Sequence, residues 1–277
     1  QERKEAMAAW GDLYEKIAPD LDQIYDRMVA LRSSMAKKLG FDSYIDFIYL
    51  ARGRYDYGPG DVAEFRRQVR EVIVPVCQRL REEQAARLGV DKLCYYDEAL
   101  VFPEGNAVPE GNREELVDKA RKMYRELSPE TGEFFDFMAD HDMFDLETKK
   151  GKRGGGYCTF LPAYKSPFIF ANFNGTNADV NVLTHEAGHA FESYTAARNI
   201  KLMDMVFSSY EVAEIHSMSM EYFTHPWMEL FFGGKADRYL YSHVMEALEA
   251  VPYMVCVDEF QHKVFENPSM TAMDRRG

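Results

Sequence analysis

The sequence predicts a mainly α-helical protein with a small antiparallel β-sheet. Apolar residues recur at helical spacing along most of the 277 residues, and capping residues stand before several of these stretches. Only two short runs, residues 157–161 and 167–173, have the composition of strands. Because turn residues separate the two runs, we expect them to pair as an antiparallel hairpin.

The first 147 residues are expected to form a helical N-terminal part. Its helices are marked by capping residues at their starts or glycines at their ends, and Pro75 is expected to kink one of them. The expected helices are residues 1–38, ending near Gly40; 42–50, capped by Asp42; 61–88, opened by Asp61 and Glu64 and stopped by Gly89; 112 onward, opened by Asn112 and Glu115; and 128–140, opened by Ser128 and Pro129.

Residues 148–277 differ in composition and are expected to form a second part. A basic, glycine-rich loop at 149–157 opens it, and this loop lacks the residue order of a phosphate-binding P-loop. The two strand runs come next. Two helices then start at capping boxes, formed by Thr176 with Asp179 for a helix from about Asn177, and by Ser208 with Glu211 for a helix through about Phe223.

The segment H-E-A-G-H, residues 185–189, lies inside the first of these two helices. Residues four apart project from one face of a helix, so His185 and His189 present two imidazoles to a single point. Two neutral nitrogens favour zinc. Glu186 leans toward the open position of such a site and can take a proton from water there. We therefore predict one Zn²⁺ per chain, with Glu186 as the catalytic general base.

A third ligand is expected from the next helix. Gly188 costs about 1 kcal/mol relative to alanine inside a helix, which indicates that another backbone comes close to it. The helix that begins at Ser208 is the obvious candidate, and Glu214 lies one turn inside it. We predict Glu214 as the third ligand, with Glu211 and His216 as alternatives.

Other titratable residues have candidate roles around the two histidines or in the fold. Glu221 and Asp179 are candidates to hold an imidazole N–H of a ligand, although surface or capping roles compete with this interpretation. The remaining histidines are expected to be structural or exposed; they are His141, His225, His243 and His262.

Several longer segments, around the motif and elsewhere in the chain, are typical of a known protein family. They are F-A-N-F-N-G-T-N-A-D-V, H-E-A-G-H-A-F-E-S-Y, the helix with Glu214 and Glu221, F-Q-H-K-V-F-E-N-P at 260–268, and the N-terminal K-K-L-G-F-D-S-Y and Y-D-Y-G-P-G-D-V. Together they resemble the M3 family of zinc oligopeptidases, in its oligoendopeptidase F-like branch. The resemblance implies a zincin-like helical metallopeptidase fold, a channel for short peptides, and the same roles for His185, Glu186, His189 and Glu214.

The resemblance also implies where a substrate would lie. An extended peptide is expected to add to a strand edge, and Gly155, Gly156 and Tyr157 are the candidate substrate-binding residues. Two features depart from the family pattern. Glu192 stands where many members have a histidine, and the chain lacks the later segment from which the family draws tyrosine and histidine stabilisers of the transition state.

Both ends of the chain suggest a fragment. Gln1 enters a helical pattern without a capping residue, and Thr271 with Asp274 opens a helix close to the last residue. We therefore expect a longer polypeptide, from which this chain lacks the C-terminal part.

Composition excludes several classes of partner. A net charge of −13, from 33 basic and 46 acidic residues, argues against binding to nucleic acid. No apolar run is long enough for a membrane span, and the first residues do not form a signal segment. The four cysteines have no CxxC spacing. We expect a protein of the reducing cytoplasm that binds neither nucleic acid nor membranes.

The predicted function is a zinc-dependent metallo-endopeptidase that hydrolyses short unstructured peptides. The alternative is a zinc-bearing peptide-binding module without turnover. Glu186 favours the enzyme, because a binding site has no need of a carboxylate that is not a ligand. A third interpretation, a helical scaffold with a chance H-E-x-x-H, predicts no bound metal at all.

Overall fold

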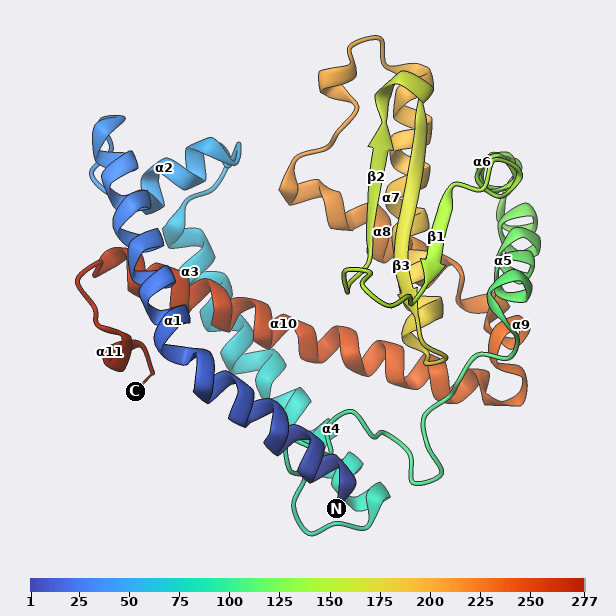
Figure 1. Cartoon of the computed structure of the whole chain (residues 1–277), viewed down its shortest axis with the longest axis horizontal. Coiled ribbons are helices and arrows are strands. Elements are labelled where there is room, and N and C mark those ends of the chain that lie inside the picture. Colours follow the sequence, from blue (N-terminus) through green and yellow to red (C-terminus); the bar gives the residue numbers. More distant parts are fainter. Residues whose placement is uncertain (277) are drawn as a thin grey trace. The chain divides into compact units, whose positions relative to one another are not determined.

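The computed structural model describes residues 1–276 and is mainly helical, with one three-stranded sheet (Figure 1). The chain divides into two compact units, Gln1–Gly105 with Val244–Gly277, and Asn106–His243. The division predicted at residue 147 falls inside the second unit, in the loop between two strands. No helix among residues 1–276 is long and apolar enough to cross a membrane.

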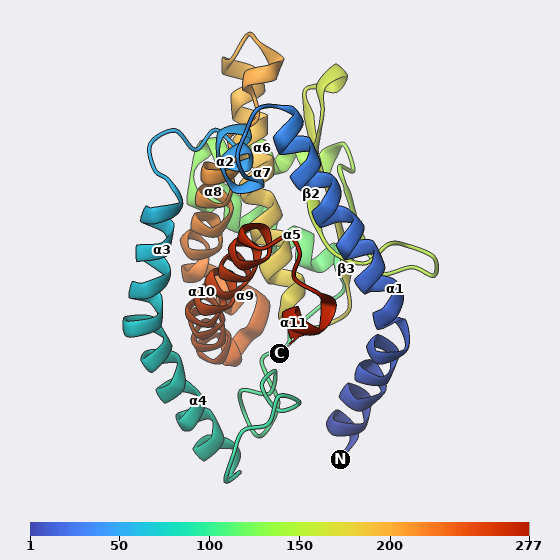
Figure 2. The ribbon, with the colours of Figure 1, turned by 90° about the vertical axis from the view of Figure 1, so that its left-hand side faces the viewer.

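The regular elements described in the first unit are all helices. Its core gathers side chains of α1 and α2 with the end of α10, among them Tyr44, Ile45 and Phe265. Figure 2 shows α3 leading into α4. Its elements are α1 (Glu2–Lys38), α2 (Tyr44–Ala51), α3 (Pro59–Gln68), a π-helical turn (Val69–Ile73), α4 (Val74–Leu88), the part of α10 (Ala236–Glu266) from Val244, and α11 (Ala272–Arg276).

The predicted helices of this unit are confirmed, but two of their starts are wrong by a few residues. Ser43, and not Asp42, caps α2, because its hydroxyl accepts from the N–H of Asp46. α3 begins earlier than expected, and Asp61 reaches back to accept from the N–H of Gly58. The interruption predicted at Pro75 is present as the π-helical turn between α3 and α4, as expected where proline removes a helical N–H.

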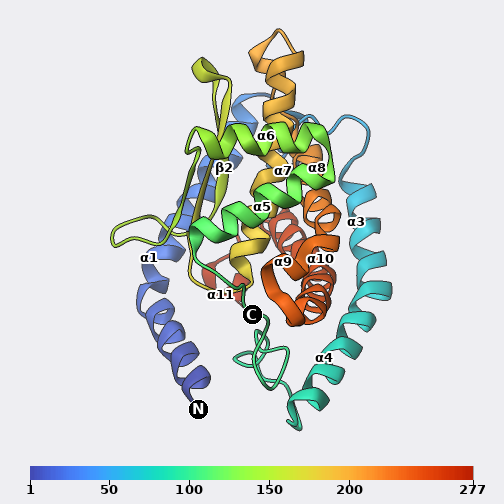
Figure 3. The same ribbon diagram turned by 90° about the vertical axis from the view of Figure 1, so that its right-hand side faces the viewer.

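The second unit combines helices with the sheet. The helices α5 and α6 lie side by side (Figure 3), and α6 also contacts α7. Its core includes Phe134, Phe135, Ile169, Leu183 and Phe231, all fully buried. Its elements are α5 (Arg113–Leu127), α6 (Pro129–Asp140), β1 (Phe144–Glu147), β2 (Tyr157–Leu161), β3 (Ser166–Phe173), α7 (Ala178–Asn199), α8 (Tyr210–Phe223), α9 (Met228–Phe232), four 3₁₀ turns (Pro162–Tyr164, Met203–Met205, His225–Trp227 and Gly233–Lys235), and the first turns of α10.

The sheet has the order β1-β3-β2 and is mixed. The expected antiparallel hairpin is confirmed, with Tyr157 opposite Phe170. β1 was not predicted, and it pairs parallel to β3, with Phe144 opposite Ile169. Because only Phe144 and Leu146 of this four-residue strand are buried, the run carries too little pattern to be recognised. β2 has β3 on one side only, so it is an edge strand among the described residues.

Two capping boxes predicted in this unit are wrong, although both helices start close to the expected residues. Before α7, the Asp179 carboxylate does not accept from the N–H of Thr176, which donates to Asn174 instead. Its oxygens accept from the N–H groups of Asn174 and Gly175, at 3.0 and 2.8 Å. α8 has Ser209 as its N-cap residue, one position later than expected. Neither Asn177 nor Ser209, the observed N-cap residues, caps its helix through a side-chain hydrogen bond.

Candidate metal centre

The helices α7 and α8 pack closely at Gly188. A Cβ atom placed on Gly188 would lie 2.6 Å from Cα of Ser217 and 2.8 Å from the carbonyl oxygen of His216. Real side chains do not approach backbone atoms so closely, so only glycine permits this contact. The close approach expected from Gly188 is confirmed, and the neighbouring element is the helix that carries Glu214.

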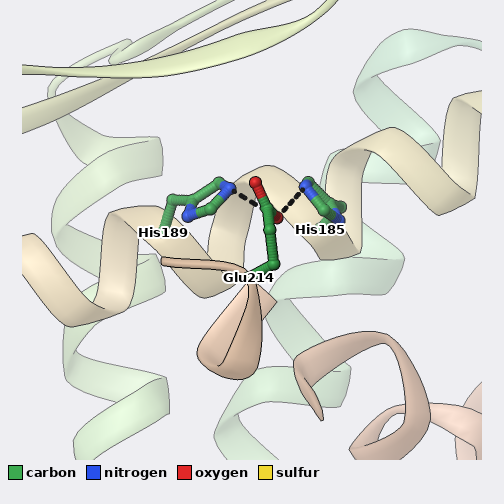
Figure 4. A group of neighbouring side chains, drawn as sticks. All are labelled: His185, His189 and Glu214. Carbon is green, nitrogen blue, oxygen red and sulfur yellow. Dashed lines mark ion pairs between the residues drawn. The ribbon is translucent and has the colours of Figure 1, made fainter. Parts of the chain in front are cut away.

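Three side chains from these two helices converge beside this contact. Nε2 of His185 lies 3.2 Å from Oε2 of Glu214, and Nε2 of His189 lies 3.4 Å from the same oxygen. One donor atom from each residue lies within 4.8 Å of the others (Figure 4). The cluster does not include Glu211 or His216, the alternatives considered for the third ligand.

The other imidazole nitrogens are already engaged by α8. Nδ1 of His185 lies 2.7 Å from Oε1 of Glu221, so it carries the proton and donates to the carboxylate. Nδ1 of His189 lies 3.1 Å from Nε2 of His216. Since a neutral His185 carries its proton on Nδ1, its Nε2 keeps the lone pair and faces Glu214, and Nε2 of His189 faces the same carboxylate. Two imidazoles and a carboxylate form the ligand set of many hydrolytic zinc sites, so these residues fit zinc.

Glu214 and Glu221 differ in a way that separates their roles. Glu214 is 58% exposed and reaches into a pocket, whereas Glu221 is 14% exposed and is bonded through both oxygens. Burial opposes ionisation of Glu221, but hydrogen bonds from His185 and His243 outweigh it and lower the pKa of this carboxyl to about 2. Glu221 therefore stays anionic and holds His185, whereas Glu214 is exposed to the pocket, where its carboxylate can bind a cation.

The carboxyl of Glu186 lies beside this cluster and is almost buried, at 7% exposure. Burial raises its pKa, opposed by the charge of His185 and by the N–H of Cys158. A divalent cation nearby would act in the opposite direction. A carboxyl with these opposing influences is suited to accept a proton and release it again.

A pocket of about 390 Å³ joins these groups to the edge strand β2. Its wall includes Gly156 and Tyr157 together with the three candidate ligands and Glu186. A Cβ on Gly156 would lie 2.8 Å from Cγ1 of Val182 and 3.5 Å from Oε1 of Glu186, so glycine allows the strand to approach α7. Gly155 stands just outside the pocket wall, with a φ of +96° that favours glycine.

The remaining candidates fall into two groups. Glu221 makes the contact that a holder of His185 requires. Asp179 does not contact a histidine in this way, because both of its oxygens bind the loop before α7. Sequence reasoning missed the roles of His216 and His243, which contact His189 and Glu221. Helical spacing could have indicated His216, whereas nothing local to His243 points to a partner 22 residues away.

The fold and this arrangement define a helical protein of the H-E-x-x-H metallopeptidase class. The sequence model of peptidase family M3 matches residues 135–275, and the chain belongs to this family. Family membership implies a catalytic metal.

Solved structures agree with this membership. PZ peptidase A, solved with an inhibitor, is 50% identical with a TM-score of 0.95; the alignment covers 99% of this chain and 48% of that one. A provisionally named oligoendopeptidase F of Bacillus anthracis is 50% identical with a TM-score of 0.93, covering 99% and 50% of the two chains. The chain thus spans about half the length of these relatives. A comparison with curated proteins finds no match.

A more distant structure shares the fold alone. This protein of Chlamydophila abortus, provisionally named a peptidase, is 16% identical, with a TM-score of 0.68 and a match to 95% of this chain and 43% of its own length.

The close packing of α7 and α8 at Gly188 can be tested by substitution. Gly188→Ala should force α7 and α8 apart and lower the free energy of unfolding by about 1–3 kcal/mol, the usual cost of overpacking. Gly11→Ala is the matched control: Gly11 is also inside a helix, but a methyl group added there would meet no atom of the described chain within 4 Å. Chemical denaturation of both variants measures the difference, and equal stabilities would contradict the close approach.

Proposed function

We propose that the protein carrying this chain is a zinc-dependent metallo-oligopeptidase that hydrolyses short, unstructured peptides. The observation that supports this most strongly is the convergence of His185, His189 and Glu214 beside the buried carboxyl of Glu186. Membership of peptidase family M3 supports the same chemistry, as does the likeness to PZ peptidase A, a peptidase solved with an inhibitor.

In the proposed mechanism three residues bind the metal and a fourth transfers the proton. His185, His189 and Glu214 hold the zinc, which when bound polarises the scissile carbonyl and makes water more acidic. Glu186 accepts a proton from the attacking water at its carboxylate and then delivers that proton to the leaving amine nitrogen. Its burial keeps bulk water from competing for this proton.

The edge strand β2 supports an extended peptide as substrate. Its outer edge is not paired with any strand of residues 1–276, so its backbone groups can bind another extended chain. Gly156 and Tyr157, at the start of this edge, line the same pocket as Glu186. A peptide added to β2 would run past the candidate metal centre, which a folded protein cannot do without local unfolding.

The alternative is a module that binds zinc and peptides without turnover. The position of Glu186 favours hydrolysis over binding alone. A binding site gains nothing from burying an ionisable carboxyl beside a metal, since burial of that group costs free energy. An enzyme, in contrast, needs this buried carboxyl as the general base.

Zinc binding can be tested with His189→Ala. Removing one of three ligands should abolish stoichiometric zinc after dialysis against a chelator, whereas the wild-type protein should keep one zinc per chain. His141→Ala is the control, because His141 is exposed and its ring nitrogen bonds to the carbonyl of Phe137, away from the candidate ligands. Metal analysis of the three proteins decides; full zinc occupancy in His189→Ala would refute the ligand assignment.

Turnover can be separated from binding with Glu186→Gln in the whole protein. Glutamine has nearly the same size but cannot accept the proton, so peptide hydrolysis should fall by about 10²- to 10⁴-fold while zinc occupancy stays unchanged. Glu192→Gln is the matched control, since Glu192 lies on the same helix and lines the same pocket. Steady-state kinetics on a fluorogenic peptide measures both variants. Cleavage by Glu186→Gln at the wild-type rate would remove Glu186 from the mechanism.

Substrate size can be tested by competition. The whole protein should cleave unstructured peptides and leave a stable native globular protein intact over the same time, because only an extended chain can add to β2. Mass spectrometry of the mixture measures both reactions. Rapid digestion of the native protein, with the peptides untouched, would contradict the proposed substrate class.

A further inference from the structure

A chain of hydrogen bonds leads away from His185 into the interior of the second unit. Oε1 of Glu221 accepts from Nδ1 of His185 at 2.7 Å, and Oε2 accepts from Nε2 of His243 at 2.5 Å. Nδ1 of His243 lies in turn 3.0 Å from Nε2 of His225. Four side chains from separate segments are thus connected in series.

The direction of these bonds follows from the carboxylate at their centre. An ionised carboxylate only accepts, so His185 and His243 must both donate to Glu221. A neutral His243 that donates through Nε2 has its lone pair on Nδ1 and must accept from His225. The tautomers of His243 and His225 are therefore coupled, and His185 is joined to this pair through the carboxylate of Glu221, which accepts from both His185 and His243.

Packing holds His243 in this orientation. Its side chain is 5% exposed, and its ring stacks on Tyr239 with centroids 5.7 Å apart and planes 9° apart. The hydroxyl of Tyr239 donates to Oδ1 of Asn181 at 2.5 Å, and Asn181 lies one turn before His185 on α7. The imidazole of His243 is consequently fixed against the helix that carries the motif.

We propose that His243 is a positioning residue of the metal centre: by donating to Glu221 it fixes the carboxylate that orients Nδ1 of His185, and His225 fixes the tautomer of His243. The proposal rests on the proposed metal site and extends it by two histidines. Such outer partners set the ring orientation and the basicity of a ligand imidazole. Without the donor from His243, one oxygen of a buried carboxylate loses its partner, and Glu221 is free to rotate away from His185.

The two ligand histidines are therefore held differently. His189 has a neutral partner, the ring of His216, at 3.1 Å. His185 has an anionic partner that is itself held from the far side. The branch through Glu221 is the stronger of the two, because hydrogen bonds to a charged group are about twice as strong as those between neutral groups.

The experiment compares His243→Ala with His243→Gln in the whole protein. The side-chain amide of glutamine can place a donor near the position of Nε2, whereas alanine cannot. We expect His243→Ala to weaken zinc binding roughly 10- to 100-fold, and His243→Gln to recover most of the loss. Ser242→Ala is the control, because Ser242 is the adjacent buried residue of α10 and its hydroxyl has no hydrogen-bond partner among residues 1–276; it should bind zinc as the wild type does.

Zinc affinity is measured by competition with a chelator at fixed pH, and a second measurement reports the orientation directly. In the zinc-loaded protein labelled with ¹⁵N-histidine, the Nδ1–H proton of His185 should shift in His243→Ala and return toward its wild-type position in His243→Gln. His225→Ala should shift the His243 resonances and weaken zinc binding less than His243→Ala does. Because His225 is only half-buried, this variant also serves as the test if His243→Ala does not fold.

Any other result of this experiment contradicts a specific part of the proposal. Equal weakening in His243→Ala and His243→Gln would mean that the ring acts by packing and not as a donor. If His243→Ala had the same zinc affinity and the same His185 Nδ1–H resonance as Ser242→Ala, His243 would have no role at the metal centre. A wild-type protein that binds no zinc would instead refute the proposed metal site itself, and this proposal with it.

Discussion

The close contact of α7 with α8 at Gly188 is the constraint on which the candidate site depends. The two candidate ligand histidines lie three residues before and one residue after Gly188, and α8 crosses at Ser217. Glu214 and Glu221 stand one turn before and about one turn after this crossing point. The distance between the two helix backbones therefore determines two contacts. It decides whether Glu214 reaches the Nε2 atoms of His185 and His189, and whether Glu221 reaches Nδ1 of His185.

One helix consequently supplies nearly all the polar partners of the two imidazoles. Glu214 faces the Nε2 atoms, while Glu221 and His216 bond the Nδ1 atoms of His185 and His189. Ser217 adds a bond of 2.7 Å from its hydroxyl to Glu214. The candidate ligand carboxylate and the groups that bond the two imidazoles thus all lie on α8. This arrangement keeps the ligand geometry accurate, since rigid elements position a site better than loops do.

The sequence predicts those parts of the structure that depend on local spacing. The motif helix, its mid-helix glycine and a carboxylate one turn into the next helix follow from periods of three and four residues, and the structure brings Glu214 to the two histidines. β1 does not follow, because its pairing with β3 depends on where a distant segment lies in space. The caps are a matter of choice between neighbouring residues: Ser43 and Asp42 can each cap a helix, and only the backbone conformation decides that Ser43 accepts from the N–H of Asp46. His243 is the clearest case: its partner Glu221 is set by the path of α10, and no spacing rule reports that path.

α7 is approached by backbone from two directions, and each approach depends on a glycine. Gly188 of α7 admits α8, and Gly156, just before β2, lets the strand come against Val182 and Glu186. Most residues of α7 near the motif are therefore buried, and Glu186 is buried with them. The two faces then serve different chemistry: His185 and His189 face the carboxylate helix, whereas Glu186 faces the strand edge. Because the motif places His185 and Glu186 next to one another on one helix, the candidate general base Glu186 lies between the candidate metal ligands and the strand to which a peptide would add.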